Sequence, residues 1–84
     1  MDEQLEEQRL ILGMRVERAR LERGWSKEQA SREAGISSIT WKRVEDGLGV
    51  QDHKRYAVLR ALGLDAQGRP VAPPEAPPGQ NVAG

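Results

Sequence analysis

The chain has 84 residues, with 13 basic side chains balancing 13 acidic ones, one histidine (His53) and no cysteine. This length allows one small domain, close to the lower limit for a self-sufficient apolar core. Without cysteine there is no disulfide or thiolate metal site, and a lone histidine cannot build a metal cluster or a catalytic triad. We therefore expect no metal, no cofactor and no enzymatic activity. No apolar run approaches membrane-spanning length and no signal peptide opens the chain, which predicts a cytoplasmic protein.

The zero net charge hides an uneven distribution of charge along the chain. Residues 1–8 carry four acidic and no basic side chains, whereas residues 9–62 carry twelve basic and seven acidic ones. Residues 63–84 are close to neutral, with two acidic side chains and one basic one. A mildly basic centre therefore lies between an acidic head and a nearly neutral tail. This distribution of charge is a better guide to binding partners than the net charge of zero.

The first expected helix occupies the segment before Gly24. Leu12, Val16 and Ala19 recur at helical spacing between charged side chains, and Gly24 supplies a C-terminal cap. Residues 1–9 are rich in helix formers, so this acidic extension can continue the helix backwards. It would then cover the core, pair with a second copy, or lie loose.

Two short helices are expected on either side of Gly35, which provides the positive φ that a tight reversal needs. Ser26 can cap the first of them, with Gln29 completing a capping box, and either Ser37 or Ser38 can cap the second. A pair of helices joined in this way is a helix-turn-helix. The expected inner positions of the pair are Ala30, Ala34, Trp41 and Val44.

The end of the chain divides into a last helix and a tail. Asp52 is expected to cap a fourth helix with Tyr56, Leu59 and Leu62 on its inner face, and Gly63 to end it. All five prolines lie in the last fifteen residues, which have almost no apolar pattern. We therefore predict an all-α, four-helix fold in three parts: an acidic helical extension (1–9), a helix-turn-helix domain (10–64) and a disordered, Pro/Gly-rich tail (65–84).

The segment "LGMRVERARLERGWSKEQASREAGISSITWKRVEDG", from Leu12 to Gly47, resembles the DNA-binding domain of phage repressor and Cro proteins, the lambda-repressor-like family. The shared features are an arginine four residues before a glycine, a Ser-x-Glu helix start, the Ala-Gly-Ile-Ser turn and a closing Val-Glu-x-Gly. The resemblance extends to about residue 64. It implies double-stranded DNA as the partner and a partly buried ion pair between Arg20 and Glu45.

The resemblance also implies roles for the residues around the turn. Lys27, at the start of the second helix, corresponds to a position that contacts the DNA backbone. The third helix would enter the major groove, where Arg43 is the best candidate for a bidentate contact with guanine. The other expected DNA-binding residues of that helix are Ser37, Ser38, Ile39 and Lys42; the alternative for Lys42 and Arg43 is an ordinary solvated helix face.

Two departures from the family pattern stand out. Trp41 replaces a smaller aliphatic residue and Ala30 replaces a larger one, at positions that face each other in the family. A compensating exchange of this kind conserves core volume and places Trp41 in the core rather than against a base. The family's frequent fifth helix, which often forms the dimer, is missing, because the proline-rich segment after residue 64 cannot form it.

The sequence thus predicts a sequence-specific DNA-binding transcriptional regulator in the bacterial cytoplasm, in its most concrete form a small phage or prophage repressor of Cro type that acts by promoter occlusion. A homodimer on a palindromic site is left open. The alternative is a protein–protein module, an antitoxin or antirepressor that keeps the fold, which the acidic head and the proline-rich tail favour. Neither reading requires a small-molecule ligand.

Overall fold

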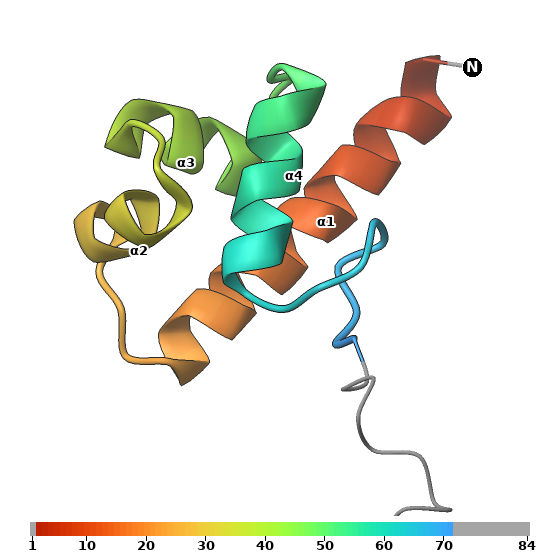
Figure 1. The fold of residues 1–84 in the computed structure, drawn as a ribbon. Coiled ribbons are helices and arrows are strands. Elements are labelled where there is room, and N and C mark those ends of the chain that lie inside the picture. Colours follow the sequence, from red (N-terminus) through yellow and green to blue (C-terminus); the bar gives the residue numbers. More distant parts are fainter. Residues whose placement is uncertain (1, 72–84) are drawn as a thin grey trace, which may run out of the picture.

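Four helices make up the computed structural model, which describes residues 2–71 (Figure 1). No strand occurs in this range beyond an isolated bridge between Leu64 and Pro70. The expected all-α, four-helix fold is therefore confirmed, and the prediction for the tail beyond residue 71 lies outside the described residues. The helices are α1 (Asp2–Glu22), α2 (Lys27–Ala34), α3 (Ser38–Glu45) and α4 (Asp52–Ala61).

Serines cap α2 and α3 as expected, although only the Ser26 half of the predicted capping box with Gln29 is formed. The Ser26 hydroxyl accepts a 3.0 Å hydrogen bond from the Gln29 N–H at the start of α2. Gly35 then turns the chain with a φ of 72°, and Ser37 caps α3 by accepting from the Thr40 N–H at 3.1 Å. Glycine is favoured at this φ because it has no Cβ to clash with the backbone. These caps satisfy N–H groups that two eight-residue helices would otherwise leave unpaired.

The start of α4 differs from the expectation. Gln51, not Asp52, occupies the cap position, and it makes no side-chain capping hydrogen bond. Asp52 is the first helical residue, where its carboxylate accepts a hydrogen bond from Arg55. It also stabilises the helix there because it faces the positive end of the helix dipole.

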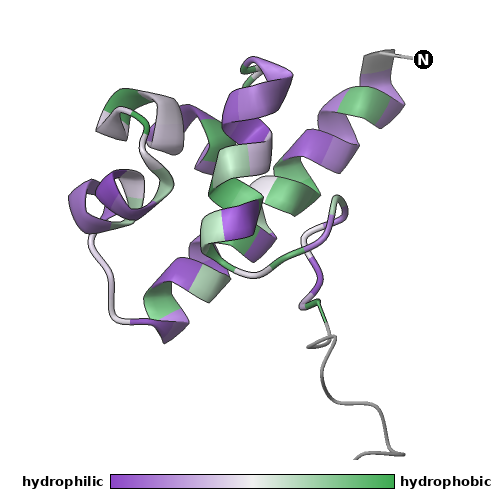
Figure 2. Cartoon of the chain, viewed as in Figure 1, coloured by the Kyte–Doolittle hydropathy of each residue, from purple (hydrophilic) through white to green (hydrophobic). Residues whose placement is uncertain are grey.

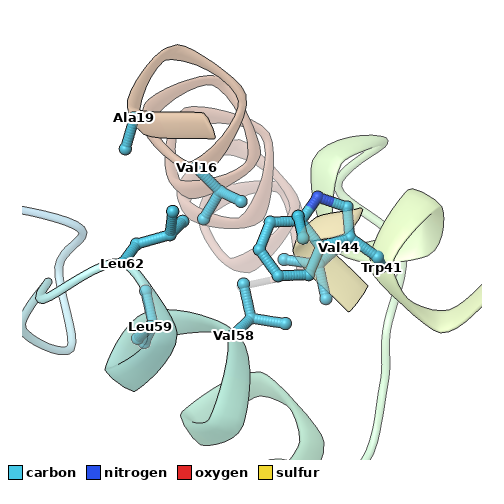
Figure 3. Close-up of a cluster of buried hydrophobic side chains, with 8 residues drawn as sticks. Val16, Ala19, Trp41, Val44, Val58, Leu59 and Leu62 are labelled. Atoms are coloured by element: carbon cyan, nitrogen blue, oxygen red, sulfur yellow. The ribbon is translucent and has the colours of Figure 1, made fainter. Parts of the chain in front are cut away.

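The apolar core lies between α1, α3 and α4, with Ala30 contributed by α2 (Figure 3). Val16, Ala30, Trp41 and Val58 have no exposed surface. The large tryptophan and the small alanine thus share one cluster, as the compensating exchange requires. The inner face of α4 is formed by Val58, Leu59 and Leu62.

Tyr56 was wrongly predicted for that inner face. It is 64 % exposed, because the buried stripe of α4 is centred on Val58 and the tyrosine lies about 200° around the helix from it. The Tyr56 ring is apolar and fits the helical spacing of the inner face of α4. Val58 also fits a helical spacing, and it is Val58 that faces the other helices. In a short helix with few apolar residues, the sequence alone does not determine which of the two side chains is buried; the contacts with the other helices do.

The first helix extends without a break through the acidic head. α1 has 21 residues, and every residue from 3 to 8 is exposed. From Asp2 onward the extension continues α1, and the side chains of residues 3–9 contribute nothing to the buried core, so they do not cover it. Only from Arg9 onward does α1 begin to approach the rest of the domain.

Gly13 sets how closely α1 approaches the end of α3. A Cβ placed on Gly13 would lie 2.4 Å from the carbonyl oxygen of Glu45 and 2.7 Å from that of Val44. Such distances are far below van der Waals contact, so any side chain at position 13 would push the two helices apart. Gly13 is buried in the middle of a long helix, where a glycine otherwise lowers stability.

A buried ion pair joins the same two helices. Arg20 Nε donates to Glu45 Oε2 at 2.6 Å and Nη2 donates to Oε1 at 3.3 Å, while Nη1 donates to the carbonyl oxygen of Trp25 at 2.8 Å. The indole Nε1 of Trp41 also donates to Glu45 Oε2 at 2.6 Å. The two charged side chains are only 8 % and 3 % exposed. The pair expected from the family resemblance is therefore present, and Trp41 joins it as a third member.

The boundary drawn at residue 64 is wrong, because residues 65–71 form an ordered turn against α1. The Asp65 carboxylate accepts hydrogen bonds from the N–H groups of Gln67 and Arg69, both at 2.9 Å. Arg15 of α1 donates to the carbonyl oxygen of Gln67 at 2.6 Å. Gly68 is buried against Leu12 and Arg15. The proline content predicted disorder for residues 65–71. Pro70 lacks a backbone N–H, but it lies at the end of the turn, where no N–H is needed to hold the turn together.

We expect Gly13→Ala to destabilise the protein, although the same change in an open helix stabilises by about 0.5–1 kcal/mol. The new methyl group meets two backbone carbonyls that cannot rotate away, and overpacking of this kind costs about 1–3 kcal/mol. Urea unfolding followed by circular dichroism measures the difference. Gln8→Ala, an exposed change in the same helix, should stay within about 0.5 kcal/mol. A Gly13→Ala variant as stable as the parent would mean that α1 and α3 are further apart than described.

Glu45→Ala should lower the free energy of unfolding by about 3–5 kcal/mol, because it leaves the Arg20 charge and the Trp41 N–H buried without their acceptor. For a domain of this size that corresponds to a fall in Tm of more than about 10 °C. Glu22→Ala is the matched control, since Glu22 makes an exposed pair with Arg18. Equal Tm values for the two variants would show that the buried Arg20–Glu45 pair does not stabilise the fold.

Asp65 gives the turn after α4 a pH dependence. The backbone N–H of Arg69, followed by that of Gln67, holds the pKa of the Asp65 carboxyl below its ordinary value, despite some desolvation. A lowered folded-state pKa means stabilisation that is complete above the unfolded value of about 3.9 and is lost as the pH falls through the folded value. Asp65→Asn should therefore lower Tm at about pH 7 and make progressively less difference below about pH 4. A gap in Tm that stays constant with pH would contradict this role.

Candidate nucleic-acid interface

The third helix presents one face to the core and the other to solvent. Trp41 and Val44 are buried against the other helices, with 0 % and 4 % exposure. Ile39, Lys42 and Arg43 are all exposed, and their spacing of three and four residues places them on one side of α3. Ile39 is 72 % exposed, the highest value among the large apolar side chains of residues 2–71. A single exposed apolar side chain is common on a protein surface, so Ile39 identifies no partner by itself; it adds an apolar contact point beside two basic side chains.

The two serines that open α3 have different environments. The Ser37 hydroxyl accepts from the Thr40 N–H and donates to Thr40 Oγ1 at 2.9 Å, so it is engaged in capping the helix. Ser38 is the first helical residue and is half-buried. Of the two serines, Ser37 therefore has a defined structural role, and a contact from it to a ligand would compete with the cap.

Lys42 is held in an exposed ion pair at the end of α3. Its Nζ lies 2.8 Å from Asp46 Oδ2, and the two side chains are 61 % and 41 % exposed. The hydrogen bond from Lys42 lowers the pKa of the Asp46 carboxyl, partly offset by desolvation, and the charges of Lys42 and Lys27 lower it further. An exposed pair of this kind contributes at most about 1 kcal/mol, so Lys42 can leave Asp46 for a stronger anion.

Lys27 lies at the first position of α2 and is half-buried. Its charge acts on Asp46 at the end of α3, which places the start of α2 near the last turn of α3. Asp46 is therefore paired directly with Lys42 and feels the charge of Lys27 without a hydrogen bond between them.

Arg43 lies in the last turn of α3 and reaches towards the following loop. Its Nη2 donates to the carbonyl oxygen of Gly49 at 2.9 Å. The guanidinium is exposed, and a hydrogen bond to a surface carbonyl is readily exchanged for another acceptor. For Arg43 to contact a base edge, its side chain must leave Gly49.

A second arginine beside this loop could not be recognised from the sequence. A Cβ on Gly49 would lie 3.7 Å from the Arg9 guanidinium, so Arg9 of α1 and Arg43 of α3 both flank Gly49. The loop from Leu48 to Gln51 is uncharged in sequence, yet it is bordered by two guanidinium groups. The two arginines are 34 positions apart, and no spacing pattern links positions so distant.

The described residues hold neither a metal-binding group nor a membrane span. Within residues 2–71, no group of acidic, histidine or cysteine side chains is arranged to hold a metal ion. None of the described helices is long and apolar enough to cross a membrane. Figure 2 shows that most residues of α2 and of the first turns of α1 are hydrophilic.

Comparison with known proteins gives one finding. A family model described as a helix-turn-helix domain matches residues 11–72, which is most of the chain. That range ends close to the ordered turn after α4 and leaves out the first two turns of α1. No match was found among curated proteins or among solved structures. On the extent of the family match, the chain belongs to the helix-turn-helix domain family.

Proposed function

We propose that this protein is a sequence-specific DNA-binding transcriptional regulator that inserts α3 into the major groove. The observation that carries the proposal is the exposed side of α3, where Ile39, Lys42 and Arg43 lie together. The opposite side of the same helix is fixed to the core by Trp41 and by the Glu45 ion pair. A rigidly held helix with one exposed basic and apolar face matches what major-groove recognition requires.

Each exposed residue has a distinct proposed contact. Arg43 pairs with guanine O6 and N7 once it leaves Gly49, and Ile39 packs on a thymine methyl group. Lys27 and Lys42 contact phosphates: Lys42 is held only by an exposed pair with Asp46, and Lys27 lies at the start of α2. Ser37 and Ser38 contact the backbone near the start of α3, with Ser37 retaining its capping role.

Arg9 adds a phosphate contact beside Gly49 to this surface. With Lys27, Lys42 and Arg9 as the phosphate-binding side chains, about three counterions are released on binding. The slope of log K against log salt is then about −3, a shallow dependence for a DNA-binding protein. Modest backbone affinity leaves most of the discrimination to base contacts from α3.

In its most concrete form, the proposed regulator is a phage or prophage repressor of Cro type. It acts by promoter occlusion in the bacterial cytoplasm, associated with the nucleoid, and has no catalytic activity and no cofactor. A homodimer on a palindromic site belongs to the same proposal. Its half-sites would lie about 34–36 Å apart, one turn of the double helix.

A protein–protein module is the second candidate, favoured by the first two turns of α1. Residues 3–8 are exposed and hold three glutamates without a basic side chain. An acidic surface repels DNA and attracts basic proteins. In vitro selection from a random duplex library separates the two functions, since an antitoxin or antirepressor of this kind would enrich no DNA sequence.

Arg43→Ala and Lys27→Ala should weaken DNA binding in different ways. Loss of a bidentate base contact removes about 1–3 kcal/mol of discrimination, so Arg43→Ala should relax the preference at one or two base pairs. Loss of a phosphate contact carries no sequence information. Lys27→Ala should therefore weaken all duplexes alike and make the salt slope shallower by about one.

Each variant is titrated against the selected site and a scrambled duplex at two salt concentrations. Arg60→Ala is the matched control, since Arg60 is an exposed arginine near the end of α4 and outside the proposed surface. An Arg43→Ala variant with intact sequence preference would show that α3 does not read bases, and the protein–protein module would become the leading candidate.

A further inference from the structure

A single exposed carboxylate lies on the side of α3 that carries the basic side chains. Asp46 directly follows α3, and its backbone keeps helical geometry, with φ −80° and ψ −1°. It comes four residues after Lys42 and three after Arg43, so the three side chains share one side of the helix. Glu45, the other acidic residue of the segment 37–49, has a side chain only 3 % exposed, against 41 % for Asp46. Asp46 is therefore the acidic group of this segment that a ligand on the exposed side of α3 meets.

Asp46 already occupies Lys42, one of the side chains proposed to contact DNA. The Lys42 Nζ lies 2.8 Å from Asp46 Oδ2, and the Asp46 N–H donates to the Lys42 carbonyl oxygen at 2.9 Å. The hydrogen bond from the Lys42 side chain lowers the pKa of the Asp46 carboxyl, partly offset by desolvation, so this group is charged at neutral pH. A phosphate that binds Lys42 has to displace a carboxylate that is already there.

We propose that Asp46 is an internal competitor of the DNA phosphates for Lys42, and that it lowers the affinity for every duplex by a similar factor. The inference rests on the proposed function, in which Lys42 contacts a phosphate. After Lys42 has moved to the phosphate, the Asp46 carboxylate remains on the same side of α3 and repels the DNA backbone.

Both effects act on the DNA backbone, which is alike in every sequence. Discrimination between sequences is therefore left to the base contacts proposed for Arg43 and Ile39. The consequence for the protein is weak binding to non-specific DNA at an unchanged preference for its own site. This role differs from that of a carboxylate that accepts a hydrogen bond from cytosine N4, which would change the preference itself.

Asp46→Asn tests the proposal in titrations against the selected site and a scrambled duplex. At low salt we expect the variant to bind both duplexes about three- to tenfold more tightly than the parent, because it removes both the competing pair and a repelling charge. The gain should shrink at higher salt, where exposed charges are screened. Asp46→Glu keeps the charge and should stay close to the parent. Circular dichroism verifies that each variant keeps its helices.

Glu22→Gln is the matched control for the change in net charge. It also removes one partner of an exposed i,i+4 pair, that between Arg18 and Glu22, but on α1. We expect it to bind both duplexes like the parent. A gain in affinity equal to that of Asp46→Asn would show that net charge, rather than the position of Asp46, sets the affinity, and would overturn the proposal.

A double-mutant cycle with Lys42→Ala separates competition from simple repulsion. In the Lys42→Ala background, Asp46→Asn should raise the affinity by less than about twofold, because no lysine is left for the carboxylate to hold. An undiminished gain would mean that Asp46 acts by repulsion alone, and competition for Lys42 would be wrong.

The remaining outcomes separate this inference from the proposed function. A parent that binds DNA and an Asp46→Asn variant of equal affinity overturn the inference and leave the function standing. Weaker binding of the variant to the selected site alone would make Asp46 a base contact, and weaker binding to both duplexes would make it a positioning residue for Lys42; either result also overturns it. A parent that binds neither duplex overturns the proposed function and this inference together.

Discussion

The buried contact between Arg20, Glu45 and Trp41 is the interaction on which the position of α3 depends. Arg20 is anchored in α1 and also donates to the carbonyl oxygen of Trp25 in the loop before α2. Glu45 is the last residue of α3, and Trp41 lies one turn before it. One carboxylate therefore receives hydrogen bonds from α1 and from its own helix. A charge buried in this way is tolerated only because its partners satisfy it completely.

This arrangement fixes the end of α3. Gly13 has no side chain, and this allows α1 to pack closely against that end. The backbone of α1 approaches the Val44 and Glu45 carbonyls at a distance no other residue type would permit. With its last turn held and its first turn capped by Ser37, an eight-residue helix has little freedom to rotate. Its exposed residues are consequently presented at a fixed angle, and a pre-organised binding surface loses less entropy on association.

The sequence predicted those parts of the structure that depend on local chemistry. The caps at Ser26 and Ser37 and the turn at Gly35 follow from residue types that favour one backbone geometry. The Arg20–Glu45 pair came from the family resemblance, since residues 25 positions apart carry no local signal. For the candidate site, the sequence predicted that Ile39, Lys42 and Arg43 would share an exposed side. It could not reveal that Arg43 is bonded to Gly49 or that Arg9 lies beside the same loop.

The failures have a common physical origin in long-range packing. Tyr56 and Val58 both fitted an apolar spacing, and only the position of the other helices decides between them. The turn from Asp65 to Pro70 is ordered by hydrogen bonds to its own backbone and by Arg15, 52 residues away from Gln67. Composition alone indicated disorder for this segment. Proline and glycine at the ends of a tight turn are equally typical of an ordered one.

The central claim, that α3 reads the major groove, is tested most directly by chemical interference on a selected site. Methylation of guanine N7 blocks the major groove, whereas methylation of adenine N3 blocks the minor groove. The account predicts that guanine N7 methylation at one or two positions abolishes binding of the parent protein, and that Arg43→Ala loses sensitivity at one of those guanines. Interference from adenine N3 alone, or binding that tolerates methylation at every guanine, would contradict the placement of α3.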